Sequence, residues 1–273
     1  MFALALVLLA CRSSAPEAPI SETPPVQRPE PLPVWPDPSA AFIHPVIRVP
    51  EGFERQTVFV NAGHGNGGRH GNLGAWCTRE SDFTLRASER LSDLLHATGH
   101  FDVVRSRTGD QRPSYGSRIR HLKRSGASTM IELHSDARAS AMVPNAVASD
   151  GEICWRDDSE PGFTILVNDR ASTEEAKERL ALARAIAVSM AEVGFVPWVG
   201  DDYEGMYDRD DVDGVWRDRR GLYMLRHPEV PAVIIETHNG KDGRETLRWE
   251  DPATHDAFGR AVLVALFRWY EER

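Results

Sequence analysis

The sequence predicts an α/β fold in which a mostly parallel central sheet is sandwiched by helices, all within a single domain. Short β-prone runs alternate along the chain with segments whose apolar residues recur at helical spacing. This alternation is typical of parallel strands joined by helical crossovers. The roughly 220 residues that follow the N-terminal tail are enough to bury one core.

The expected elements follow one another in a regular order. The first strand is residues 57–61, which end in a glycine-rich turn at 63–68, and the first helix is residues 81–97. The other expected strands are residues 101–106, 129–133 and 230–236. The other expected helices are residues 115–125, 174–193, with Gly194 placed to end it, and 252–271, with a proline in its first turn.

The first eleven residues resemble a lipoprotein signal peptide with its lipobox. Residues 2–10 are almost wholly apolar, and the small residue Ala10 directly precedes Cys11. Cleavage before such a cysteine exposes it for lipidation, which predicts a membrane anchor at Cys11. An ordinary cleaved signal is the alternative, since no basic residue precedes the apolar run.

Residues 12–50 differ in composition from the rest of the chain. Eleven of the eighteen prolines lie between residues 13 and 50. Such a segment favours extended polyproline II structure and buries little apolar surface. It predicts a linker with a reach on the order of 100 Å, leaving residues 51–273 as the folded domain.

The composition also narrows the range of partners. The net charge is -9 and no run of Lys or Arg stands out, so we expect no nucleic-acid partner. Three cysteines are too few for a disulfide framework. If the signal peptide exports the chain, Cys77 and Cys154 would lie in an oxidising compartment. The sequence leaves open whether they pair.

Residues capable of metal or acid–base chemistry follow three of the expected strands. His64 lies just past the first strand, while His134 and Glu236 end two others, and Glu80 opens the first helix. Singly, each has an ordinary role as a hydrogen-bonded core residue, a helix N-terminal acid or an ion-pair partner. Together they predict a catalytic metal site, because two imidazoles and a carboxylate are a common zinc ligand set.

Seven blocks in a fixed order carry a resemblance to a known family. They are Gly63-His64-Gly65, Glu80, Arg107-Thr108-Gly109-Asp110, Arg118, Leu133-His134-Ser135-Asp136-Ala137, Gly221-Leu222-Tyr223-Met224-Leu225-Arg226 and Pro231-Ala232-Val233-Ile234-Ile235-Glu236. From about residue 57 onward the chain resembles the zinc-dependent N-acetylmuramoyl-L-alanine amidases of the AmiA, AmiB and AmiC type.

The resemblance implies a cofactor, a reaction and a substrate. His64, Glu80 and His134 would bind Zn²⁺, and Glu236 would be the catalytic acid–base that works with a zinc-activated water. The substrate would be peptidoglycan, cut at the amide between N-acetylmuramic acid and the L-alanine of the stem peptide. With the anchor at Cys11, the implied location is periplasmic, on a bacterial membrane.

Three residues depart from the family pattern. Asn61 stands where the family usually has Asp. Glu132 replaces a small polar residue and shares a strand face with His134, so it is either an orienting partner of that imidazole or an alternative ligand. His238 enters the site if its strand continues, or else lies in a turn beyond it.

Two other functions stay open: a zinc peptidase or deacylase of other N-acyl amides, and a non-catalytic cell-wall-binding lipoprotein. Residues 138–173 and 200–220 look like inserted loops that shape the substrate groove or restrain activity. A regulatory protein is a further expected partner.

Overall fold

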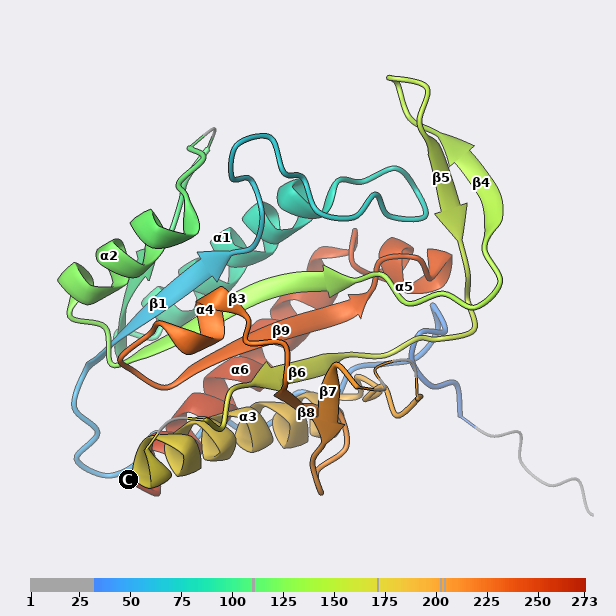
Figure 1. The fold of residues 1–273 in the computed structure, drawn as a ribbon. Helices are drawn as coiled ribbons and strands as arrows, with labels where there is room; N and C mark the ends of the chain where they lie inside the picture. Colours follow the sequence, from blue (N-terminus) through green and yellow to red (C-terminus); the bar gives the residue numbers. More distant parts are fainter. Residues whose placement is uncertain (1–31, 110, 171, 202, 204) are drawn as a thin grey trace, which may run out of the picture. The chain divides into compact units, whose positions relative to one another are not determined.

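The structure is a computed structural model that describes residues 32–109, 111–170, 172–201, 203 and 205–273. The signal peptide and Cys11 lie outside the described residues. A seven-stranded sheet with the order β2-β1-β3-β9-β6-β8-β7 forms the centre of the domain (Figure 1). Its strands are β1 (Gln56–Ala62), β2 (Phe101–Arg105), β3 (Thr129–Asp136), β6 (Thr164–Val167), β7 (Tyr207–Arg209), β8 (Val215–Asp218) and β9 (Ala232–Asn239).

The mostly parallel sheet predicted from the sequence is confirmed. β2, β1, β3 and β9 are parallel neighbours, and β8 is parallel to β6. Two pairs are antiparallel, β6 with β9 and β7 with β8. The carboxyl ends of β1, β3 and β9 therefore meet at one edge of the sheet, where ligands bind in open α/β sheets.

Six helices surround the sheet in the described part of the chain: α1 (Glu80–Ala97), α2 (Tyr115–Ser125), α3 (Thr173–Val193), α4 (Tyr223–Arg226), α5 (Gly243–Arg248) and α6 (Pro252–Glu271). Helices α1, α3 and α6 lie on one face of the sheet (Figure 1). Alternate side chains of the strands pack on them, and the main core lies there. The shorter helices α2 and α4 cover part of the other face, leaving room for a site. No helix in the described ranges is long and apolar enough to span a membrane.

The two segments predicted as loops contain short strands. Residues 138–173 contain the hairpin of β4 (Val143–Val147) and β5 (Ile153–Arg156) as well as β6, and residues 200–220 contain β7 and β8. These strands of three to five residues are too short to show a clear alternating pattern. Aromatic side chains of the second segment pack in a cluster with Trp198, and one of them, Tyr207, also lines a cavity.

Cys77 and Cys154 form a disulfide, which settles the question that the sequence left open. Their Cα atoms are 5.3 Å apart, although the residues are 77 positions apart in the chain. The bond ties the loop before α1 to β5. The β4–β5 hairpin is thereby fixed near the edge of the sheet that carries the site.

The packed unit begins before residue 51, where the sequence placed the domain boundary. Trp35 is only 4% exposed and packs in a tilted arrangement against Phe42 and Phe195 in the main core. Arg248 donates hydrogen bonds to the backbone carbonyls of residues 37, 38 and 40. A few large aromatic side chains between the prolines are thus enough to hold residues 33–50 against the domain.

The buried carboxyl group of Glu245 helps to hold residues 33–50 against the domain. Glu245 accepts hydrogen bonds from the Trp35 indole and from the backbone N–H groups of Gly162 and Asn239, the last two at 3.0 and 2.8 Å. Burial raises the pKa of Glu245 to about 7, while the Trp35 and Asn239 bonds act in the opposite direction.

This pKa makes stability depend on pH. Between the ordinary value of 4.5 and about 7 the folded state holds a proton on Glu245 that the unfolded chain has lost. The free energy of unfolding should therefore fall as pH rises across this window, by about 3 kcal/mol from this residue. Chemical denaturation from pH 4.5 to 8 should show a shallower pH dependence in Glu245→Gln. Equal slopes for both proteins would contradict the assignment.

Candidate metal centre and active site

The structure brings all four predicted site residues together at the carboxyl edge of the sheet. His64 lies two residues beyond the end of β1, and Glu80 is the first residue of α1. His134 and Glu236 occupy paired positions on the neighbouring strands β3 and β9. Strand register and a single helix start therefore assemble the site.

Three of these residues can hold a metal ion. Glu80 Oε1 lies 3.1 Å from His64 Nε2 and 2.8 Å from His134 Nδ1. One candidate ligand atom from each residue lies within 4.8 Å of the others. Two imidazoles and a carboxylate suit Zn²⁺, and three protein ligands leave a position for water or substrate.

The charges around the group favour a cation. Burial would raise the pKa of Glu80, but the hydrogen bonds from His134 and His64 outweigh burial and hold that pKa below its usual range. Burial opposes the charged form of His134, yet the carboxylates of Glu132 and Glu80 raise its pKa well above the usual value. A site that stabilises a proton so strongly is equally suited to a bound metal cation.

The loop before α1 positions Glu80. Asn72 donates two hydrogen bonds of 2.9 Å to Glu80 Oε2, one from its backbone and one from its side chain. A Cβ atom at Gly71 would lie 2.3 Å from the same carboxylate oxygen and 2.7 Å from the His64 ring, so only glycine fits there. Sequence reasoning missed Asn72, because a polar loop residue carries no periodic signal.

Two arginines of the family-like blocks hold the turn that carries His64. Arg107 donates to the Gly63 carbonyl at 3.1 Å. Arg118 donates to the His64 carbonyl and, at 2.8 Å, to Asn61 Oδ1. These bonds support a left-handed backbone at His64, with φ of 56°, which a residue with a Cβ adopts only when its surroundings impose it.

Glu132 is a hydrogen-bond partner of His134 rather than a member of the three-residue ligand group. Glu132 Oε1 lies 3.2 Å from His134 Nε2, whereas Glu80 faces Nδ1 of the same ring. An ionised carboxylate only accepts, so Nε2 donates its proton to Glu132. A metal ion would take the place of the Nδ1 proton that now faces Glu80, because an outer carboxylate on Nε2 fixes both the tautomer and the ring orientation of a ligating histidine.

Neither prediction for His238 is correct. The register between β3 and β9 shifts after His134, and this irregularity sends His238 to the opposite face of the sheet. Its ring stacks on Trp249 with centroids 5.5 Å apart and meets the edge of Phe83 at 4.8 Å. Burial lowers the pKa of His238 to about 3, so it is a neutral core residue.

Glu236 faces a cavity of about 260 Å³ beside the ligand group. Burial raises the pKa of its carboxyl well above the usual range, while His134 lowers it and Asp136 raises it further. Glu236 Oε2 is buried and has no hydrogen-bond partner among the described residues. Tyr115 and Tyr207 add aromatic surface to the same cavity. The arrangement can hold a polar group beside a metal and move a proton at Glu236.

A His–Glu–His group beside a buried carboxylate, at the strand ends of an α/β sheet, is the arrangement of metal-dependent hydrolases. Residues 58–268 match the family model described as N-acetylmuramoyl-L-alanine amidase. The chain belongs to this family. No curated protein sequence matches it.

Solved amidase structures share the fold. The N-acetylmuramoyl-L-alanine amidase of Clostridium difficile 630 superposes with a TM-score of 0.60 at 18% identity, over 81% of this chain and 99% of that one. Ami1 from Mycobacterium smegmatis gives 0.61 at 16% identity, over 81% and 99%. The CwlD amidase from Clostridioides difficile, solved in complex with the GerS lipoprotein, gives 0.56 at 16% identity, over 80% and 100%.

Removing the Glu132 carboxylate should weaken metal binding. Glu132→Leu takes away the acceptor for His134 Nε2, and we expect Zn²⁺ affinity to fall about 10- to 100-fold. Glu132→Gln keeps an acceptor oxygen and should lose less. Competition with a chelator measures the affinity, and thermal unfolding of the metal-free proteins checks the fold.

The remote, exposed substitution Glu54→Gln removes one carboxylate far from the site and serves as the charge control. Unchanged affinity in Glu132→Leu would show that Glu132 does not orient the imidazole.

Proposed function

We propose that this chain hydrolyses the amide between the lactyl group of N-acetylmuramic acid and the L-alanine of the stem peptide in peptidoglycan. His64, Glu80 and His134 would hold Zn²⁺, and Glu236 would be the general base and acid. The observation that carries the proposal is the pairing of His134 with Glu236 across β3 and β9, which sets a proton-transfer group directly beside the ligand group. Membership of the amidase family supports the same reaction.

The residues of the chain divide the work in a simple way. Bound Zn²⁺ would supply a lowered pKa for water and polarisation of the scissile carbonyl. Glu236 takes a proton from the attacking water and returns it to the nitrogen of L-alanine, which must leave as a neutral amine. Glu132 and Asn72 hold His134 and Glu80 in place.

The buried carboxylate oxygen of Glu236 beside the hydrogen-bonded ligand group favours an enzyme over a non-catalytic cell-wall-binding lipoprotein. A binding protein has no need of a buried Glu236 oxygen without a partner in the described residues, because such an atom costs folding free energy. A peptidase or deacylase of other N-acyl amides would use the same chemistry, so substrate comparison distinguishes it.

We also propose a periplasmic location with a lipid anchor at Cys11. The Cys77–Cys154 disulfide supports an oxidising compartment. The complex of a related amidase, CwlD, with the GerS lipoprotein supports the idea that a second protein regulates this chain.

The decisive test of the proposed function is Glu236→Gln in the full chain. The variant should bind one zinc per chain like the wild type, but digestion of peptidoglycan should fall about 100- to 10,000-fold, the share that a positioned acid–base supplies. Metal analysis and the release of L-alanine amino termini measure the two properties. Zinc binding without wall cleavage by the wild type would point to another N-acyl amide, and a wild type that binds no zinc would overturn the mechanism.

A further inference from the structure

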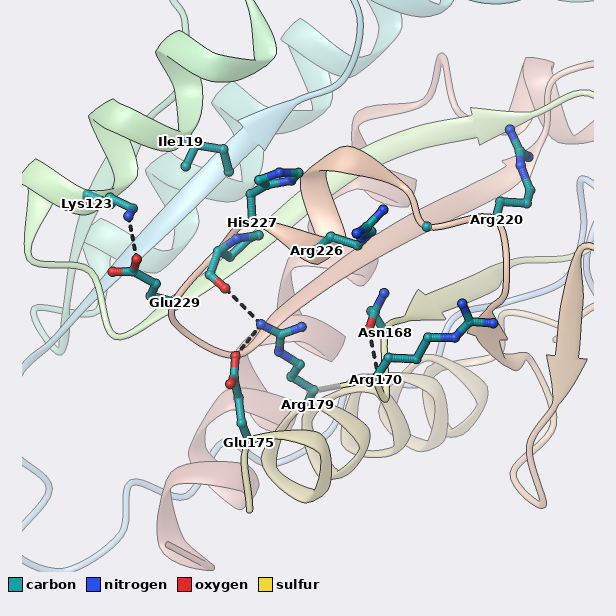
Figure 2. A pocket seen from close by; sticks show the side chains of 12 residues that line it. Ile119, Lys123, Asn168, Arg170, Glu175, Arg179, Arg220, Arg226, His227 and Glu229 are labelled. Atoms are coloured by element: carbon teal, nitrogen blue, oxygen red, sulfur yellow. Dashed lines mark hydrogen bonds and ion pairs between the residues drawn. The ribbon is translucent and has the colours of Figure 1, made fainter. Parts of the chain in front are cut away.

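A second and larger cavity, of about 730 Å³, lies between α2, α4 and the start of α3. We call it the cationic groove and define it by its five basic side chains, Lys123, Arg170, Arg179, Arg220 and Arg226 (Figure 2). None of them belongs to the ligand group or to its immediate support. The proposed reaction therefore assigns no role to the groove.

Two of the five cations are neutralised within the groove. Lys123 pairs with Glu229, and Arg179 pairs with Glu175 while also donating to the backbone carbonyls of Leu225 and Pro228. These interactions are structural, because Arg179 is almost fully buried and joins α3 to the segment after α4.

The other three cations are exposed and have no carboxylate partner among the described residues. Arg170 follows β6, Arg220 follows β8 and Arg226 ends α4, so three separate segments bring them to one groove (Figure 2). Arg220 donates to the Tyr207 hydroxyl at 3.0 Å. The backbone N–H of Arg170 donates to Asn168 Oδ1 at 2.9 Å, but the guanidinium groups of Arg170 and Arg226 make no hydrogen bond within the described residues. Guanidinium groups gathered without counter-charges are suited to anions, above all to carboxylates that they contact through two N–H donors.

The groove adjoins the cavity of the candidate active site. Arg220 lines both cavities, and the adjoining residues Leu222 and Tyr223 line the smaller one. Asn168, on the wall of the groove, follows Val167, which pairs with Val233 on β9. Val233 precedes Glu236 by three residues, so the groove begins about 10 Å from Glu236 along the strand.

We propose that the cationic groove binds the carboxylates of the stem peptide while the scissile amide lies at Glu236. This inference rests on the proposed function. An extended peptide advances about 3.3 Å per residue, so the fourth stem residue reaches the start of the groove when the first lies at the site. The stem peptide carries free carboxylates, whereas the N-acetylated sugars of the glycan are uncharged. The peptide is thus the arm of the substrate whose charge complements the groove.

The test compares two muramoyl peptides that differ only in whether the stem carboxylates are free or amidated. We expect the wild type to favour the free acid about tenfold in kcat/KM. Arg170→Gln and Arg226→Gln should each reduce that preference about threefold to fivefold, mainly through KM, and the double variant should bring the ratio close to one. The preference should also shrink with added salt.

Arg90→Gln is the matched control, because this exposed arginine lies on α1, across the sheet from the groove. Circular dichroism and thermal unfolding confirm that the variants keep their fold. A preference ratio that is the same in the wild type and in the double variant would overturn the inference.

A binding experiment separates this inference from the proposed function. Calorimetry with the free stem peptide, which has no scissile bond, should show an affinity that the double variant loses. Such binding in a wild type that cleaves neither substrate would refute the proposed function and leave the groove as a peptide site. Binding of glycerol phosphate oligomers in place of the peptide would assign the groove to phosphate polymers and overturn the inference.

Discussion

The parallel pairing of β3 with β9 is the constraint on which the site depends. It places His134 beside Glu236, and no side-chain rearrangement could bring them together if the register differed by one residue. Glu80 joins them because α1 starts at the edge of the sheet, where its carboxylate accepts from both imidazoles. The register shift just beyond His134 changes the face to which the following side chains of β9 point, so His238 points into the core and not into the site.

Two of the three departures from the family pattern, Asn61 and Glu132, form one arrangement. Asn61 and Glu132 are paired positions of β1 and β3, so their side chains stand on the same face of neighbouring strands. An Asp in place of Asn61 would add a second carboxylate beside Glu132, and two buried like charges at that distance would raise the cost of both. The chain keeps one carboxylate near the imidazoles and supplies it from β3. Arg118 binds the Asn61 oxygen and carries the charge that faces Glu132.

The sequence allowed the central features to be predicted, and the missing ones share a physical cause. The long helices and four of the parallel strands have enough residues to show their period, and the site residues stand at their ends. The strands β6, β7 and β8 are too short to do so, and they form because β9 offers an unpaired edge. Trp35, Asn72 and His238 owe their places to contacts distant in the sequence, which no local pattern records.

The net charge of the chain is -9, so it needs a locally positive surface to bind an acidic polymer. At physiological ionic strength charges are screened beyond about 8 Å, so a ligand within the cationic groove interacts mainly with the charges of the groove itself. Residues 168–170 follow β6, and residues 220–226 lie in the connection from β8 to β9. Two of the short strands that were hardest to predict, β6 and β8, therefore lead directly into the segments that carry Arg170 and Arg220. The strands beyond β9 in the sheet order, β6, β8 and β7, thus lead to the arginine side chains, which the ligand group and Glu236 do not include.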